Sequence, residues 1–223
     1  MNNLLILPGG GNPDTPIYSR VYSVISREAK MRGYDQVFTH IRWPGHTTAD
    51  KYEISPSLTL PAAVNATKDC IAALPPAPFV ILARSFGCVV ALKLIQQANP
   101  IDRCPSKIIL WGPIPYWMIW ETCVRDFDAT RDKSKTKGLK IDHSYYATTE
   151  PVESLIQKIE IPTIIAAGED DPYCKPAYLD YLRSIAKNNP HIEIKEKVRG
   201  APHEVTDENG ADVVRNYTQT LFD

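Results

Sequence analysis

The sequence predicts an α/β protein in which a mostly parallel central sheet of about six strands carries helices on both faces. Short apolar runs alternate along the chain with longer segments whose apolar residues recur every three or four positions. Continuous apolar runs are typical of strands buried on both faces, and their alternation with helices is typical of a parallel sheet. The length of 223 residues suffices for a core without disulfides or metals, so we expect a single domain over residues 1–223.

The first strand is the apolar run Leu4–Leu7, which ends at Pro8 and three glycines. Thr15 offers an N-cap and Pro16 a first helical residue, so a helix should follow and stop at Gly33. The later elements repeat this alternation. In order they are the strand 36–43, the helix 60–74, the strand 79–83, the helix 88–98, the strand 107–112, the helix 150–158, the strand 162–168, the helix 176–188, the strand 192–198 and a helix from about Glu208.

Residues 113–149 interrupt the alternation with an aromatic stretch, "PIPYWMIWE", followed by a charged and weakly patterned one. We expect this segment to be a short cap or lid over the edge of the sheet where ligands bind. Some of its aromatic side chains should pack as core, and the others would line an apolar substrate pocket. The candidates for such substrate-binding residues are Trp111, Tyr116, Trp117 and Trp120.

Composition argues against several classes of protein. The 25 basic and 26 acidic side chains nearly cancel, which disfavours nucleic acid and anionic membranes as partners. No apolar run approaches the roughly twenty residues of a membrane span. The five cysteines include no C-x-x-C pair, so we expect neither a disulfide framework nor a metal site, and no other cofactor. With an amino terminus unlike a secretory signal, these features predict a cytoplasmic protein.

The segment "FVILARSFGCVVALKLI" places Ser85 where a buried strand gives way to a helix. Small residues, Ala83 and Gly87, flank the serine two positions away on either side, close to the G-x-S-x-G pattern of a nucleophile elbow. Alanine replaces the usual first glycine, and a single methyl can be accommodated there. Taken alone, this match would favour the simpler interpretation that Ser85 is a small residue at a strand-to-helix junction.

Two later turns carry the partners that a catalytic serine needs. A histidine must take the proton of the serine, and an acid must hold the histidine in the correct tautomer. "GEDDP" follows one predicted strand and contains Asp170 and Asp171, whereas "GAPHE" follows the next strand and contains His203. Because the carboxyl ends of parallel strands meet at one edge of the sheet, we expect Ser85, one of these aspartates and His203 to lie together.

On these motifs the chain resembles the α/β-hydrolase superfamily over nearly its whole length. The resemblance implies that Ser85 is the nucleophile, that His203 is the general base and then acid, and that Asp171 is the acid, with Asp170 as the competing choice. It also implies an oxyanion hole formed by the backbone N–H groups of Phe86 and of Gly10 in "LPGGGN". "RWPGH" is similar to the turn that follows the next strand in that superfamily. The two leading strands of the superfamily are absent, so we expect a minimal six-stranded version of its fold.

The predicted function is that of a serine hydrolase that cleaves a carboxylic ester or thioester of a small apolar acyl substrate. The same three residues could instead support acyl transfer or hydrolysis of a carbon–carbon bond. A third alternative is a ligand-binding protein that keeps the scaffold without turnover, because a fold does not fix a function. Arg84 adjoins the nucleophile and could bind an anionic group of the substrate, or could simply pack.

Overall fold

The computed structural model describes residues 2–10, 16–39, 41–43, 60–97, 103–113, 152–174, 176–203, 205 and 211–222. These residues form a sheet of six strands in the order β2-β1-β3-β4-β5-β6, and every neighbouring pair is parallel. The strands are β1 (Asn2–Leu7), β2 (Tyr34–Phe38), β3 (Phe79–Arg84), β4 (Lys107–Trp111), β5 (Thr163–Ala166) and β6 (Ile192–Ile194). The predicted fold class is therefore confirmed.

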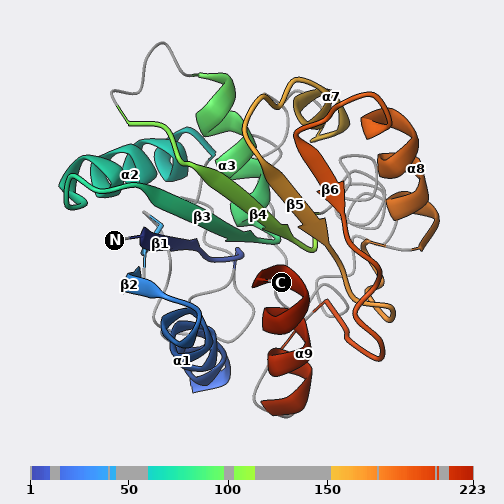
Figure 1. The fold of residues 1–223 in the computed structure, drawn as a ribbon, viewed down its shortest axis with the longest axis horizontal. Coiled ribbons are helices and arrows are strands. Elements are labelled where there is room, and N and C mark those ends of the chain that lie inside the picture. The colour runs from blue at the N-terminus through green and yellow to red at the C-terminus, as the bar shows by residue number, and fades with distance from the viewer. Residues whose placement is uncertain are drawn as a thin grey trace, which may run out of the picture.

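Helices cover both faces of this sheet (Figure 1). On one face lie α1 (Pro16–Met31) and α9 (Ala211–Phe222), which contact each other. On the other face lie α2 (Leu60–Ala73), α3 (Phe86–Gln96), α7 (Val152–Gln157) and α8 (Pro176–Ala186). None of the helices in the described part of the chain has the length and apolarity to cross a membrane.

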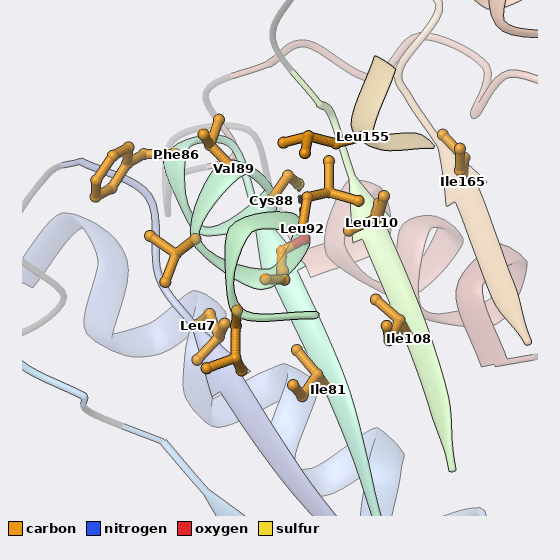
Figure 2. Packing of buried hydrophobic residues seen from close by; sticks show 14 of the residues in the cluster. Leu7, Ile81, Phe86, Cys88, Val89, Leu92, Ile108, Leu110, Leu155 and Ile165 are labelled. Carbon is orange, nitrogen blue, oxygen red and sulfur yellow. Dashed lines mark hydrogen bonds between the residues drawn. The ribbon is translucent and has the colours of Figure 1, made fainter. Parts of the chain in front are cut away.

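Alternation along the strands divides the core into two layers. Leu5 and Leu7 of β1 pack with α2 and α3, whereas Leu4 and Ile6 pack with α1 and α9. Figure 2 shows the first layer, in which Leu92 and other apolar side chains of α3 lie against residues of β3, β4 and β5. Burying one such side chain contributes about 1.5–3 kcal/mol, so the strands that carry the catalytic candidates are firmly fixed.

The direction in which successive strands are added across the sheet reverses between β1 and β3. The connection after β1 runs through α1 on one face, and the connection after β3 runs through α3 on the opposite face. Open α/β sheets bind ligands at the carboxyl ends of the strands beside such a change. Ser85 follows β3, and the loop of Gly9 and Gly10 follows β1, so both occupy this position.

The second and the last strand differ most from those expected from the sequence. The second strand was expected over 36–43, but β2 spans Tyr34–Phe38, and Ile41 and Trp43 are buried outside the ladder. Their alternation with exposed Arg42 mimics a strand, because residues buried in alternation give the same sequence pattern whether or not their backbone pairs in a ladder. Likewise β6 is shorter than 192–198, and Val198 instead forms an isolated bridge with Gly168. The predicted cap 113–149 lies outside the described residues, apart from Pro113.

Candidate active site

Ser85 occupies a strained turn between β3 and α3. Its φ of 53° and ψ of −117° make it the one residue other than glycine with a positive φ in the described part of the chain. Such a conformation costs on the order of 1–3 kcal/mol and persists only where the surroundings impose it. Here the backbone N–H of Ser85 donates to Trp111 O at 3.0 Å, and Ser85 O accepts from Cys88 N at 2.9 Å. The turn is thus held on both sides.

Crowding around the turn explains the glycines near it. A Cβ at Gly87 would lie 2.6 Å from both Leu7 O and Pro8 O, so α3 can start here only with glycine at that position. A Cβ at Gly9 would lie 3.4 Å from Ser85 Cβ and 3.8 Å from Ser85 Oγ. The loop after β1 therefore passes directly beside the serine side chain.

His203 makes contacts with both of its predicted partners. Its Nε2 lies 3.0 Å from Ser85 Oγ, and its Nδ1 lies 2.7 Å from Asp171 Oδ2. His203 and Asp171 are 4% and 2% exposed, whereas the Asp170 side chain is exposed. The other oxygen of Asp171, Oδ1, accepts the backbone N–H groups of Tyr173 and Cys174, each at 2.8 Å. Both carboxylate oxygens are thus engaged, which fixes the plane of the acid beside the ring.

The loops that carry Asp171 and His203 are joined to each other. Glu169 N donates to Val198 O at 2.9 Å, and Asp170 N donates to Ala201 O at 3.1 Å. A Cβ at Gly168 would lie 1.8 Å from Ala201 O, so the two backbones touch at a point where only glycine fits. The separation of the acid from the histidine is therefore set by main-chain contacts.

Two neighbours of the histidine were not predicted from the sequence. The ring of Tyr173 meets the His203 ring edge-on, with centroids 4.8 Å apart. Gly112 directly follows β4 and has a φ of 59°. A Cβ there would lie 3.2 Å from both Asp171 Oδ2 and His203 Nδ1. A glycine directly after a buried strand was a usable signal for Gly112, because the same feature marks Gly168. Tyr173 carried none.

Comparison with known proteins rests on structure. No family model matches the sequence, and no curated protein matches it. Mouse alpha/beta hydrolase domain-containing protein 10 superposes with a TM-score of 0.65 at 12% identity, with 98% of this chain and 87% of that chain covered. For an extracellular alpha/beta-hydrolase from a Paenibacillus species the TM-score is 0.61 at 13% identity, with 100% of both chains covered. For a monoacylglycerol lipase from Paleococcus ferrophilus it is 0.60 at 14%, with 99% and 93% covered.

The chain has the α/β-hydrolase fold. Within this fold, Phe86 directly follows the nucleophile and is the first residue of α3. Gly10 is half-buried and follows Gly9, which lies against Ser85. The oxyanion-hole role of Phe86 and Gly10 stays a prediction that these positions favour.

The predicted substrate-binding residues of the α/β-hydrolase core are buried. Arg84 is 3% exposed and donates from Nη2 to the backbone oxygen of His203 at 3.0 Å. Its guanidinium carbon lies 5.6 Å from the ring centroid of Trp111, which is 1% exposed. Their contact with substrate stays a prediction. In this structure Arg84 is hydrogen-bonded to the histidine loop and lies beside the Trp111 ring. Tyr116, Trp117 and Trp120 lie outside the described residues.

Buried thiols near the elbow offer no competing nucleophile. Burial raises the pKa of the Cys88 thiol and of the Cys174 thiol far above the usual range for cysteine. A thiol attacks as its thiolate, so both side chains are inert at neutral pH. Within the described ranges there is also no group of three or more histidine, cysteine, aspartate or glutamate side chains that could hold a metal ion.

Proposed function

We propose that this protein is a serine hydrolase that cleaves a carboxylic ester or thioester of a small apolar acyl substrate. One observation carries the proposal: Asp171, His203 and Ser85 form an unbroken series of contacts at 2.7 and 3.0 Å, and it ends on a strained serine. A surface serine that merely closes a turn needs neither a histidine at hydrogen-bond distance nor a buried carboxylate behind that histidine. The α/β-hydrolase fold supports the proposal as well.

In the proposed acylation step, Ser85 Oγ attacks the carbonyl carbon of the substrate while His203 Nε2 takes the hydroxyl proton. The imidazolium that forms is stabilised by Asp171 Oδ2, which accepts a hydrogen bond from Nδ1–H. Because Asp171 Oδ1 is already held by two backbone N–H groups, the carboxylate keeps its position as the charge develops. His203 then gives its proton to the departing alcohol or thiol, and the acyl-enzyme remains.

In the proposed deacylation step, His203 removes a proton from water, which attacks the acyl carbon. The bond from that carbon to Ser85 Oγ then breaks, His203 returns the proton to Ser85 Oγ, and the acid is released. Both tetrahedral intermediates carry a negative oxygen. Backbone N–H groups aimed at such an oxygen typically contribute more to the rate than any other single group. We assign this role to Phe86 N and Gly10 N, since Phe86 follows the nucleophile and Gly10 belongs to the loop that passes beside it.

The apolar acyl group follows from the aromatic residues that the sequence places after β4. The carboxyl end of β4 lies beside that of β3, since Arg84 pairs with Trp111 in the ladder. A chain that continues from Trp111 therefore starts next to Ser85. Aromatic side chains there suit an acyl chain or an aromatic group better than a sugar or a small polar amide.

Labelling with a fluorophosphonate probe tests the chemistry directly. The wild-type protein should be labelled at Ser85 and should hydrolyse p-nitrophenyl esters or acyl thioesters in a screen of graded chain lengths. Ser85→Ala should lose labelling and lower kcat by several orders of magnitude. Ser184→Ala, which changes an exposed serine on α8, is the matched control and should behave as wild type. Undiminished turnover in Ser85→Ala would overturn the proposal, and labelling of Ser85 without turnover of any ester or thioester would contradict the substrate class.

A further inference from the structure

Trp43 contacts both segments that the proposed reaction assigns to the oxyanion hole, the loop after β1 and the start of α3. Its indole Nε1 donates a hydrogen bond of 3.2 Å to the backbone oxygen of Gly9. The same ring meets the ring of Phe86 edge-on, with centroids 6.0 Å apart. Trp43 is 1% exposed and lies outside any strand or helix, so it is fixed by its surroundings.

The bond to Gly9 O determines where the neighbouring N–H points. Gly9 C=O and Gly10 N–H belong to one peptide unit, which is planar, and in a trans unit the two groups point in opposite directions. The described residues contain no cis peptide bond. With Gly9 O held toward the buried indole, Gly10 N–H must point away from it, and Gly10 is the less buried of the two residues.

A glycine loop needs such an anchor. Glycine populates positive and negative φ about equally, so the run Gly9, Gly10 and Gly11 has little intrinsic preference for one orientation of the peptide unit. A flipped unit would turn the carbonyl of Gly9, instead of the N–H of Gly10, toward the intermediate, and a carbonyl repels an oxyanion. The indole bond is the observed contact that selects between these orientations.

We propose that Trp43 is the positioning residue of the oxyanion hole. It orients the Gly9–Gly10 peptide unit through its N–H and buttresses the start of α3 through its contact with Phe86. This inference rests on the proposed serine hydrolase function and adds a residue that acts through the Gly9–Gly10 peptide unit and through Phe86. Both contacts come from the Trp43 indole, so this one ring positions the two segments that carry the donors of the oxyanion hole.

The test separates orientation of the peptide unit from core packing. Trp43→Phe keeps an aromatic ring but removes the N–H, and should lower kcat about tenfold to a hundredfold, somewhat less than the loss of an oxyanion donor itself. KM for a short p-nitrophenyl ester should change little. Affinity for a trifluoromethyl ketone, which forms a tetrahedral adduct with an oxyanion, should fall by a similar factor.

Phe79→Leu is the control for packing, because Phe79 lies in the same core layer but at the far end of β3. It should lower the melting temperature without changing kcat or affinity for the ketone. If Trp43→Phe does not fold, replacing Trp43 with 3-benzothienylalanine keeps the bicyclic shape and again removes the N–H. Wild-type kcat and ketone affinity in a folded Trp43 variant would overturn the inference. Since Ser85→Ala would still be inactive in that case, the proposed function would survive.

Discussion

Asp171 Oδ2 lies 2.7 Å from His203 Nδ1, whereas the side chain of the adjacent Asp170 is exposed. The different hydrogen bonds of the two residues explain this difference in exposure. The N–H of Asp170 is bound to Ala201 O in the joined loops, and the next residue turns inward, where Asp171 Oδ1 receives two backbone donors. One position of displacement thus separates a candidate catalytic acid from a solvated surface carboxylate.

Substitution of the two aspartates should therefore have opposite outcomes. Asp171→Asn places an amide beside Nδ1 and favours the wrong tautomer of His203, so kcat should fall by about 10⁴. Asp170→Asn is the matched control and should leave kcat near the wild-type value. Steady-state kinetics on one activated ester measures both. A large loss in Asp170→Asn alone would assign the acid to the other residue.

Much of the fold could be predicted from the sequence because its central strands are short and largely apolar. The run at β3 is buried at all six positions, and the helices beside it carry clear starts and stops. Prediction was weaker where apolar side chains are buried without a ladder. Ile41 and Trp43 are buried in the core on either side of exposed Arg42, yet they follow β2 without pairing in the ladder, and no local pattern distinguishes the two cases.

The candidate site divides in the same way. Ser85, Asp171 and His203 could be proposed from the turns that follow three strands, because the geometry of a parallel sheet brings those turns together. The contact made by Trp43 depends on how distant segments cross, and the sequence contains no signal for a hydrogen bond that spans 34 positions. For Arg84 the sequence left two alternatives open, binding of an anionic group and packing, and the structure shows that the side chain is buried.

The crossing of the two loops at Gly168 should be intolerant of any side chain. In Gly168→Ala the new Cβ would lie 1.8 Å from Ala201 O. That clash can be relieved only if the loop that carries Asp171 moves away from the loop that carries His203. We expect loss of activity and at least about 3 kcal/mol of destabilisation in urea unfolding.

Gly33→Ala provides the comparison, because Gly33 has a φ of 85° with no heavy atom within 4 Å of the new Cβ. It should cost only about 1 kcal/mol and keep full activity. Equal activity and equal stability of the two variants would mean that the close approach at Gly168 does not determine the separation of Asp171 from His203.

Stability should fall at alkaline pH because of the buried thiols. Burial raises the pKa of Cys88 and of Cys174, so both stay protonated in the folded protein, whereas in the unfolded chain they ionise near pH 8.5. Above that pH the unfolded state binds fewer protons than the folded state, and the free energy of unfolding decreases as pH rises. Each thiol contributes a slope of up to about 1.4 kcal/mol per pH unit.

Urea unfolding between about pH 8 and pH 9 measures that slope, because unfolded tyrosines ionise only near pH 10. A double variant, Cys88→Ala with Cys174→Ala, should be less stable at neutral pH because it leaves cavities, yet its stability should decline less steeply with pH. Parallel curves for the two proteins would show that the thiols are not the groups responsible.

Arg84 provides a test between substrate binding and support of the histidine loop. Its guanidinium donates to His203 O at 3.0 Å and is almost fully buried, so we expect a positioning role. Arg84→Met keeps the length of the side chain and removes the donor, and a hydrogen bond from a charged group is worth about 1.5–3 kcal/mol. A small displacement of His203 should lower kcat about tenfold or more, since errors near 1 Å can cost a hundredfold.

The discriminating measurement compares a neutral ester with an ester that carries a carboxylate on its acyl chain. If Arg84 supports His203, Arg84→Met should lower kcat for both esters by the same factor, with KM little changed, because the defect lies in proton transfer. Arg84→Lys, which retains a charged donor, should recover part of the rate. If Arg84 binds an anionic group instead, the variant should raise KM for the carboxylate ester alone and leave the neutral ester unaffected. That outcome would require the guanidinium to leave its buried position beside Trp111 when substrate binds.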